Sequence, residues 1–323
     1  MKKLSVVSAV LIFSLVIFTS CAKKAAGPEP GSAKVNEMLN LLPKDVQAVF
    51  FVDLHKAIST DFVDKELEKE KSQEEYQEFV DETGIDPKTD IYFITGAMKG
   101  FGKTKQKGAI IVNLKYDKET LLAKIRQEEG ELKEEDYNGF TIYSAGKKED
   151  ENAGAFLDDS NIVLGSSEGV RATIDTYQKK TESVLKNEEL APLIKQTNQD
   201  ALFWATVLIP PEALEQATSA NPMLSSFVGI NAASLYFDYK NKNIIAEIKV
   251  MGGDEAKNQQ IVDVLNGFKT MGAMASTKDP NVGLLLEKIE ISSSADHVKV
   301  YANVPEDLIS KLSSKKEVTT PEK

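Results

Sequence analysis

The sequence predicts an α+β fold built from two related units, each a largely antiparallel sheet with helices on one face. Runs rich in β-branched and aromatic residues alternate along the chain with runs whose apolar residues recur three and four positions apart. The later strand-like runs have one polar and one apolar face, and most connections are short enough for hairpins. These features favour antiparallel sheets covered by helices. Whether the two units share one sheet stays open.

The first predicted unit covers residues 35–196. Its predicted strands are 47–54, 91–97, 108–114, 137–145, 153–158 and 161–165. Asp117 is the predicted N-cap of a helix in which Leu121, Leu122 and Ile125 share one face. A second helix is expected to begin at Ser166 or Ser167, and the charged run at 64–78 is interpreted as a solvated helix.

The second predicted unit, residues 197–315, repeats this order of elements with little identity. DALFWATVLI at 200–209 corresponds to the first strand, and GINAASLYFDY at 229–239 aligns with GIDPKTDIYFI at 84–94. The remaining predictions are strands at 243–250, 288–293 and 297–303 and helices beginning at Asp254 and Pro305. The last residues, 316–323, are expected to form a disordered tail.

The alternation of strand-like and helix-like runs resembles that of bacterial extracytoplasmic proteins of the DUF3352 type. Segments such as LPKDVQAVFFVDL and LDDSNIVLGSSEGVRATID carry this resemblance. That family has no assigned activity. The resemblance spans much of the chain, and it rests on the pattern of elements rather than on diagnostic residues.

The N-terminus has the pattern of an export signal, predicted over residues 1–20. Lys2 and Lys3 precede an apolar run from Leu4 to Phe18, which is shorter than the roughly twenty residues needed to span a bilayer. A removable signal is therefore the favoured interpretation, with an uncleaved signal anchor as the alternative.

Cys21 is the only cysteine of the chain, so no disulfide can form within it. Phe18-Thr19-Ser20-Cys21 resembles the lipobox of bacterial lipoproteins, although phenylalanine replaces the usual leucine. The resemblance implies acylation of Cys21, membrane attachment, and a place in the cell envelope, at the outer membrane or facing the periplasm. Residues 21–34 then comprise the lipidated cysteine and a flexible tether with two prolines and two glycines.

Composition narrows the range of partners. The chain carries a net charge of -11, which becomes -13 when Lys2 and Lys3 leave with the signal. Because an acidic surface repels phosphate backbones, no nucleic acid partner is expected. The membrane and an envelope protein or polymer remain as expected partners.

AMKGFGKT at 97–104 matches the looser form of a phosphate-binding loop. Such a loop needs a helix starting at the lysine, but KQKG and the β-branched run AIIVNL follow instead. We therefore expect a hairpin loop, and no nucleotide or other cofactor. As an alternative role, Lys99, Lys103, Lys105 and Lys107 would form a basic tip that contacts lipid headgroups or an anionic polymer.

No catalytic or metal-binding set is recognised. The two histidines, His55 and His297, are far apart in the sequence and no HxxxH or cysteine pair accompanies them. The serines of GSSEG at 165–169 are interpreted as helix caps rather than as nucleophiles.

The function predicted from these observations is a lipid-anchored, non-enzymatic binding or scaffolding module of the cell envelope. Two alternatives stay open. A hydrolase of envelope material would use carboxylates in a cleft between the units, and would show acids with raised pKa values there. A carrier of an apolar ligand would show an enclosed cavity between sheet and helices.

Overall fold

The computed structural model describes residues 32–63, 70–100, 106–144, 153–276 and 279–317, so Cys21 lies outside the described residues. The chain separates into two compact units, Met1–Lys195 and Gln196–Lys323, called unit 1 and unit 2 here. Both combine antiparallel sheet with helices, and the predicted α+β class is confirmed. None of the described helices is long and apolar enough to cross a membrane.

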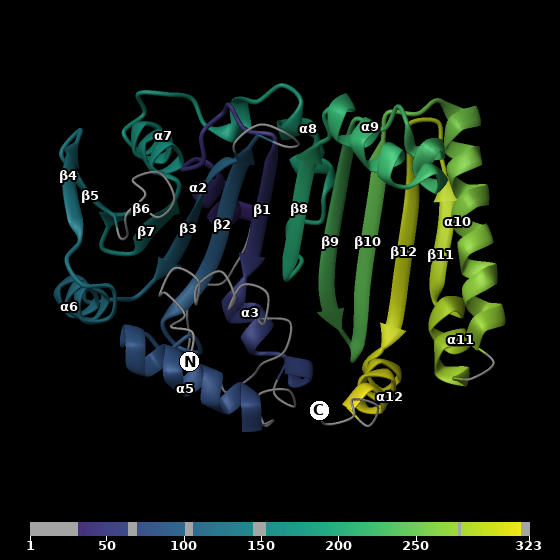
Figure 1. The fold of residues 1–323 in the computed structure, drawn as a ribbon, viewed down its shortest axis with the longest axis horizontal. Coiled ribbons are helices and arrows are strands. Elements are labelled where there is room, and N and C mark those ends of the chain that lie inside the picture. The colour runs from purple at the N-terminus through teal and green to yellow at the C-terminus, as the bar shows by residue number, and fades with distance from the viewer. Residues whose placement is uncertain (1–31, 64–69, 101–105, 145–152, 277–278, 318–323) are drawn as a thin grey trace. The chain divides into compact units, whose positions relative to one another are not determined.

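Unit 1 contains a sheet with the strand order β1-β2-β3-β7-β6-β5-β4 (Figure 1). All of its recorded strand pairs are antiparallel. The strands are β1 (Ala48–Asp53), β2 (Ile91–Lys99), β3 (Lys107–Leu114), β4 (Lys133–Tyr137), β5 (Phe140–Ser144), β6 (Ala153–Asp158) and β7 (Asn161–Gly165). The helices are α2 (Ser32–Leu39), α3 (Leu54–Ile58), α5 (Glu70–Thr83), α6 (Lys118–Glu129), α7 (Ser167–Tyr177), η1 (Val184–Lys186) and α8 (Leu190–Gln196).

Unit 2 contains a sheet with the strand order β8-β9-β10-β12-β11, again with antiparallel pairs. The strands are β8 (Phe203–Leu208), β9 (Ala232–Lys240), β10 (Asn243–Met251), β11 (Ile289–Ser293) and β12 (His297–Pro305). The helices are α9 (Pro211–Ala220), η2 (Pro222–Phe227), α10 (Glu255–Ala275), α11 (Pro280–Glu287) and α12 (Glu306–Glu317). This order follows the same path as β1-β2-β3-β7-β6 in unit 1, while a common origin of the units stays a prediction.

Side-chain caps fix the starts of several helices, among them α6, α7 and α10. Asp117 accepts a hydrogen bond from the amide of Thr120, and Ser166 accepts one from Gly169. The side chain of Asp254 accepts a hydrogen bond from the amide of Lys257 at the start of α10. Each cap satisfies an amide that has no partner within its helix, and all three follow from the sequence.

The sheet of unit 1 is buried on both faces at β3, which differs from the expected one-sided cover. Ile111 and Val112 of β3 point to opposite faces because successive strand residues alternate, and they are only 0% and 6% exposed. Val112 packs with Leu54 of α3, Phe79 of α5 and Leu121 of α6. The run AIIVNL is apolar at successive positions, and this is the pattern of a strand buried on both sides.

In its described residues, 137–144, the predicted strand 137–145 is part of a hairpin instead of a single strand. β4 ends at Tyr137, and β5 begins at Phe140. Between them Asn138 and Gly139 have φ angles of 56° and 82°. Asn-Gly favours this two-residue turn because both positions need positive φ. The dipeptide was the available signal, and the sequence interpretation passed over it.

Two ends of the folded region also differ from the sequence expectation. α2 begins at Ser32, within the segment predicted as tether, and its Val35 is buried. α12 continues to Glu317, beyond the predicted end of the second unit at residue 315.

Candidate functional site

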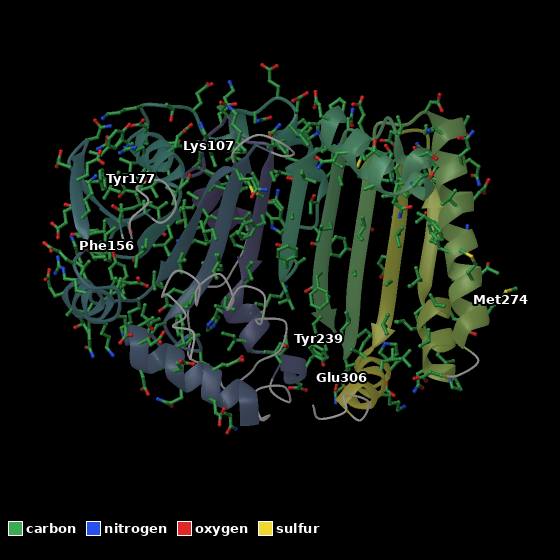
Figure 2. All side chains as sticks on the ribbon, viewed as in Figure 1. Lys107, Phe156, Tyr177, Tyr239, Met274 and Glu306 are labelled. Carbon is green, nitrogen blue, oxygen red and sulfur yellow. The ribbon has the colours of Figure 1, made fainter. Side chains whose placement is uncertain are left out.

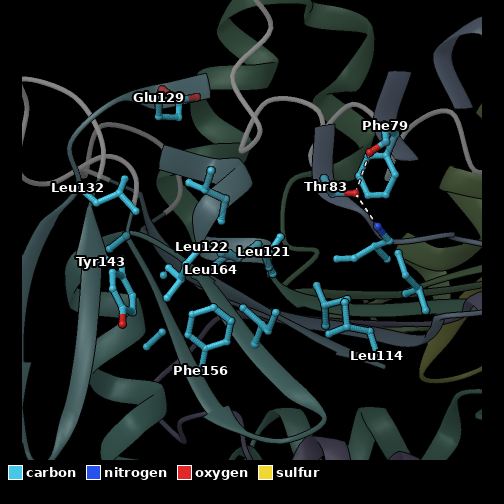
Figure 3. Close-up of a pocket in the computed structure, with 18 of the residues that line it drawn as sticks. Phe79, Thr83, Leu114, Leu121, Leu122, Glu129, Leu132, Tyr143, Phe156 and Leu164 are labelled. Atoms are coloured by element: carbon cyan, nitrogen blue, oxygen red, sulfur yellow. Dashed lines mark hydrogen bonds between the residues drawn. The ribbon is translucent and has the colours of Figure 1, made fainter. Parts of the chain in front are cut away.

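An apolar cavity of about 130 Å³ lies in unit 1 between the sheet and the helices α5 and α6 (Figure 3). One wall comes from the strands β2, β3, β6 and β7, and the other comes from α6 and the C-terminal end of α5. Its apolar lining includes Phe79, Ile91, Ile94, Val112, Leu114, Leu121, Leu122, Ile125, Leu132, Phe156, Ile162 and Leu164. Segments from Phe79 to Leu164 therefore meet around one void.

Local sequence explains how α6 presents its apolar side to this void. Leu121, Leu122 and Ile125 lie on one face of the helix, as predicted, and all three line the cavity. On the strand side Gly154 leaves room, because a Cβ atom there would lie 2.8 Å from the Cδ2 atom of Leu164. Gly154, the second residue of β6, therefore leaves space for the side chain of Leu164 in the wall of the cavity.

Phe156 of β6 forms an aromatic wall. Its ring stacks on Tyr116 with 5.4 Å between centroids and meets Tyr143 edge to face at 5.9 Å. The ammonium group of Lys118 lies 5.1 Å from the centroid of the same ring. These contacts hold the ring in place from several sides.

Few polar side chains reach the cavity. The hydroxyl of Thr83 donates to the carbonyl of Phe79 at 2.7 Å and accepts from the amide of Ile85 at 3.1 Å. Tyr143 and Glu129 are partly exposed, which places them where the lining meets solvent (Figure 3). The interior can therefore hold apolar groups, and polar contacts are confined to its edge.

Acidic side chains gather on the outer side of the same two helices. A shallow groove between α5 and α6 is lined by Glu74, Gln77, Glu78, Asp81, Glu82 and Glu128. Partial burial raises the pKa of Glu82 above its usual value, and the negative charges of Glu78, Glu128 and Glu129 raise it further. These carboxylates are therefore close enough to repel one another.

The basic tip is only partly described. Lys103 and Lys105 lie outside the described residues. Lys99 and Lys107 are paired across β2 and β3, so the predicted hairpin is confirmed in the described strands. Lys99 forms an ion pair with Asp45, and Lys107 forms one with Glu168. Part of the positive charge expected at the tip is therefore balanced within the protein.

The two histidines of the chain, His297 and His55, lie in different surroundings. His297 lies beside Ser294 and Asp296 on the turn between β11 and β12, a cluster that sequence reasoning missed. Its Nδ1 atom is 2.8 Å from both Ser294 Oγ and Asp296 Oδ1, and these contacts lower the pKa of Asp296. A catalytic triad instead uses the two ring nitrogens for two different partners.

The other histidine, His55, lies near the ring of Tyr92, with 6.2 Å between centroids. Within the described residues, no group of three His, Cys, Asp or Glu side chains could hold a metal ion.

Comparison with known proteins gives a family and a distant structural likeness. Residues 103–317 match the family described as a protein of unknown function, DUF3352. Crystal form III of TP0453 is 11% identical, with 90% of this chain and 100% of that chain covered and a TM-score of 0.49. Crystal form IV of TP0453 is 10% identical, with 85% and 96% covered and a TM-score of 0.49. No curated protein shows significant sequence similarity.

Proposed function

The chain belongs to the DUF3352 family of proteins of unknown function, and we propose that it is a lipid-anchored, non-enzymatic binding protein of the cell envelope. In this proposal unit 1 binds one apolar chain in the cavity between its sheet and the helices α5 and α6. The observation that carries the proposal is the apolar lining of that cavity. Of the three functions considered from the sequence, the carrier of an apolar ligand is the one that requires such a cavity.

The size of the cavity limits what enters it. An engineered cavity of about 150 Å³ with a similar lining stays dry and takes up benzene, whereas pockets for drug-sized ligands measure about 300–1,000 Å³. A cavity of about 130 Å³ therefore suits the end of a single narrow hydrocarbon chain. Each methylene group that enters contributes about 0.8 kcal/mol.

The hydrolase alternative has less support. Acid–base cleavage by two carboxylates needs two acids facing one substrate site. Among the described residues, Glu129 is the one carboxylate that lines the cavity. Glu82, the one described carboxylic acid with a raised pKa, lies in the outer groove instead. The proposal therefore assigns no catalytic residue, metal or cofactor, and it retains the expectation that neither nucleotide nor nucleic acid is a ligand.

Titration calorimetry with 1-octanol tests the cavity. Leu122 lines it and is 5% exposed, but it is not part of the cluster of core residues around Leu121. Leu122→Phe should fill the space and abolish binding, whereas Leu122→Ala should enlarge it and retain binding. Each variant disturbs the same position, so a loss of binding in both would indicate damage rather than filling. Unchanged binding by a folded Leu122→Phe variant would contradict the proposal.

The anchor is a separate part of the proposal, because Cys21 lies outside the described residues. We propose that acylated Cys21 holds the protein at a membrane of the envelope, with an envelope protein or polymer as a further partner. Cys21→Ala should move the protein to the soluble fraction, and mass spectrometry of the wild-type protein should show the added acyl groups. A variant that stays as firmly bound to membranes would rule out this anchor.

A further inference from the structure

A row of polar side chains crosses the sheet of unit 2. Thr206 of β8 is opposite Ser234 of β9, which is opposite Lys249 of β10. Lys249 is in turn opposite Lys299 of β12, and Lys299 is opposite Ser292 of β11. Directly opposed residues of antiparallel strands lie on the same face, with their Cβ atoms about 4.5–5.5 Å apart. These five residues therefore form one continuous row, called the lysine row here.

The lysine row lies on the face of the sheet opposite to α10. Val298, which precedes Lys299 in β12, belongs to one core cluster with Ile261 of α10. Because successive strand residues point to opposite faces, Lys299 points away from that cluster. Exposure along the row increases from Thr206, which is 1% exposed, to the exposed Ser292 on β11 at the end of the strand order. A ligand therefore has access to the row from its β11 end.

Several polar groups of the lysine row have no protein partner. The buried hydroxyl of Thr206 makes no hydrogen bond within the described residues. Among the same residues Lys299 forms no ion pair, whereas Lys249 forms one with Glu247 at 3.1 Å. Buried hydroxyls normally have a hydrogen-bond partner, and like charges directly opposite each other destabilise a sheet. An anion between Lys249 and Lys299 would offset their repulsion.

A second row on the same face contains two tyrosines. Tyr236 of β9 and Tyr301 of β12 are both opposite Glu247 of β10, and Glu290 of β11 is opposite Tyr301. Burial and the negative charge of Glu247 raise the pKa of Tyr236 to about 12, so its hydroxyl is protonated at neutral pH. This tyrosine row is two residues from the lysine row along each strand, which is roughly 6.6–6.8 Å. The phenols therefore supply neutral hydrogen-bond donors beside the lysines.

Charge limits which anion fits these rows. Two ammonium groups match the two negative charges of a phosphate monoester, and lysine binds phosphate as a point charge. Glu247 and Glu290 carry negative charge in the tyrosine row, and the chain as a whole has a net charge of -11. A long polyanion would extend into this negative potential, whereas a single phosphate group would not. The rows therefore favour one phosphate attached to an uncharged polar group.

We propose that this face of unit 2 binds a small polyol phosphate, such as a glycerol or sugar phosphate, with its phosphate between the two lysines and its hydroxyl groups beside the two tyrosines. The ligand is a soluble molecule rather than a lipid, because neither row contributes a leucine, isoleucine or valine against which an acyl chain would pack. This site is separate from the cavity of unit 1 and does not depend on it.

Titration calorimetry of the full-length protein with glycerol 3-phosphate, at pH 7.5 and low salt, tests the inference. Glycerol 3-phosphate should bind at least about tenfold more tightly than glycerol, which lacks the charged group. In 1 M salt, where the Debye length is about 3 Å, this difference should shrink.

Lys299→Gln tests the lysine row directly, since Lys299 has no ion pair to lose among the described residues. The variant should bind glycerol 3-phosphate about tenfold more weakly. Its melting temperature without ligand should stay equal or rise, because the repulsion from Lys249 disappears, and this separates a lost site from a damaged fold. Lys242→Gln, at the exposed turn between β9 and β10, is the matched control and should bind within about twofold of the wild type.

Glu247→Gln should change the affinity in the opposite direction. It frees Lys249 from its ion pair and removes a negative charge beside the phosphate, so binding should tighten about threefold. Glu212→Gln, which removes an exposed carboxylate from α9, is the matched control and should leave the affinity unchanged.

Several results would overturn the inference. Absence of glycerol 3-phosphate binding, or equal binding by Lys299→Gln, would reject the site. Tighter binding of polyphosphate than of glycerol 3-phosphate would reject the single-phosphate class. Binding only to vesicles that contain phosphatidic acid would assign the phosphate to a lipid and reject the polyol. The proposed function is judged separately, because 1-octanol binding reports on the cavity of unit 1.

Discussion

Both units have a sheet face with apolar side chains. Helices cover this face in unit 1, whereas part of it is exposed in unit 2. In unit 1 Ile94 pairs with Val112, and both are buried in the cluster that α3, α5 and α6 complete. In unit 2 Ile248 pairs with Leu235 and Val300, yet Ile248 is 47% exposed. An apolar strand face alone therefore does not determine whether helices close over it.

The position of the helices explains the difference within unit 2. Ile261 and Val262 of α10 pack against Val298 and Val250 at one end of the sheet. At the other end the hydroxyl of Tyr239 donates to Glu306 at the start of α12 (Figure 2). The middle of β9 and β10 lies between these contacts, and none of the described helices crosses it in the view of Figure 1. Among the side chains that the structure describes, the exposed large apolar ones all belong to unit 2: Val228, Ile248, Met271, Met274 and Leu284.

The largest expected effect compares one substitution on the two faces. Ile94→Asp should destabilise unit 1 by about 4 kcal/mol or more, because it buries an unpaired charge at a position only 4% exposed. Ile248→Asp should cost about 1 kcal/mol in unit 2, since the carboxylate reaches water. Denaturant-dependent hydrogen exchange, measured on peptides of each unit, gives both values. An equally large loss at Ile248 would mean that its face is covered in solution.

Truncating one leucine in a helix of each unit compares how firmly the helices α6 and α11 are packed. Leu122→Ala in α6 removes a buried side chain beside the cavity and should cost about 3 kcal/mol. Leu284→Ala in α11 should change stability by less than about 0.5 kcal/mol, because Leu284 is 47% exposed. The same exchange measurement applies. Equal costs would show that α11 is as firmly packed as α6.

The β4–β5 hairpin, whose described strands have no counterpart in the strand order of unit 2, gives a smaller effect. Gly139→Ala should cost about 1 kcal/mol, because φ there is 82° while no atom lies within 4 Å of the added Cβ. Gly267→Ala, within α10 and equally free of contacts, should instead stabilise by about 0.5–1 kcal/mol. Thermal melts of the two variants should shift in opposite directions, and shifts of the same sign would contradict this account.

The smallest effect concerns Glu82 over the closed face. Because folding raises the pKa of Glu82, the folded chain binds more protons than the unfolded chain in the window above the usual glutamate pKa. Stability therefore falls as pH rises through that window. Glu82→Gln should raise the melting temperature by on the order of 1 °C at pH 7.5 and have almost no effect at pH 4. A larger increase in melting temperature at pH 4 than at pH 7.5 would contradict a raised pKa of Glu82 in the folded chain.

Several elements followed from local sequence because their causes are local. Asp117, Ser166 and Asp254 each cap a helix through the amide three residues further along. The spacing of Leu121, Leu122 and Ile125 defined one face of α6. The Asn138-Gly139 turn was equally readable and was missed. From the sequence we expected an enclosed cavity only if the protein were a carrier, and we could not name the residues that line it. The lining combines residues that are distant in the sequence, from Phe79 to Leu164.

The sequence by itself determined which segments become strands and helices, because periodicity and capping act over a few residues. It also determined the acidic charge of the chain and placed one cysteine after an export-like segment. Only the tertiary structure decided that α5 and α6 close over the sheet of unit 1, leave a void and bring Glu82 toward Glu128 and Glu129. Closing a face depends on how distant side chains fill space together, and no local pattern encodes that volume.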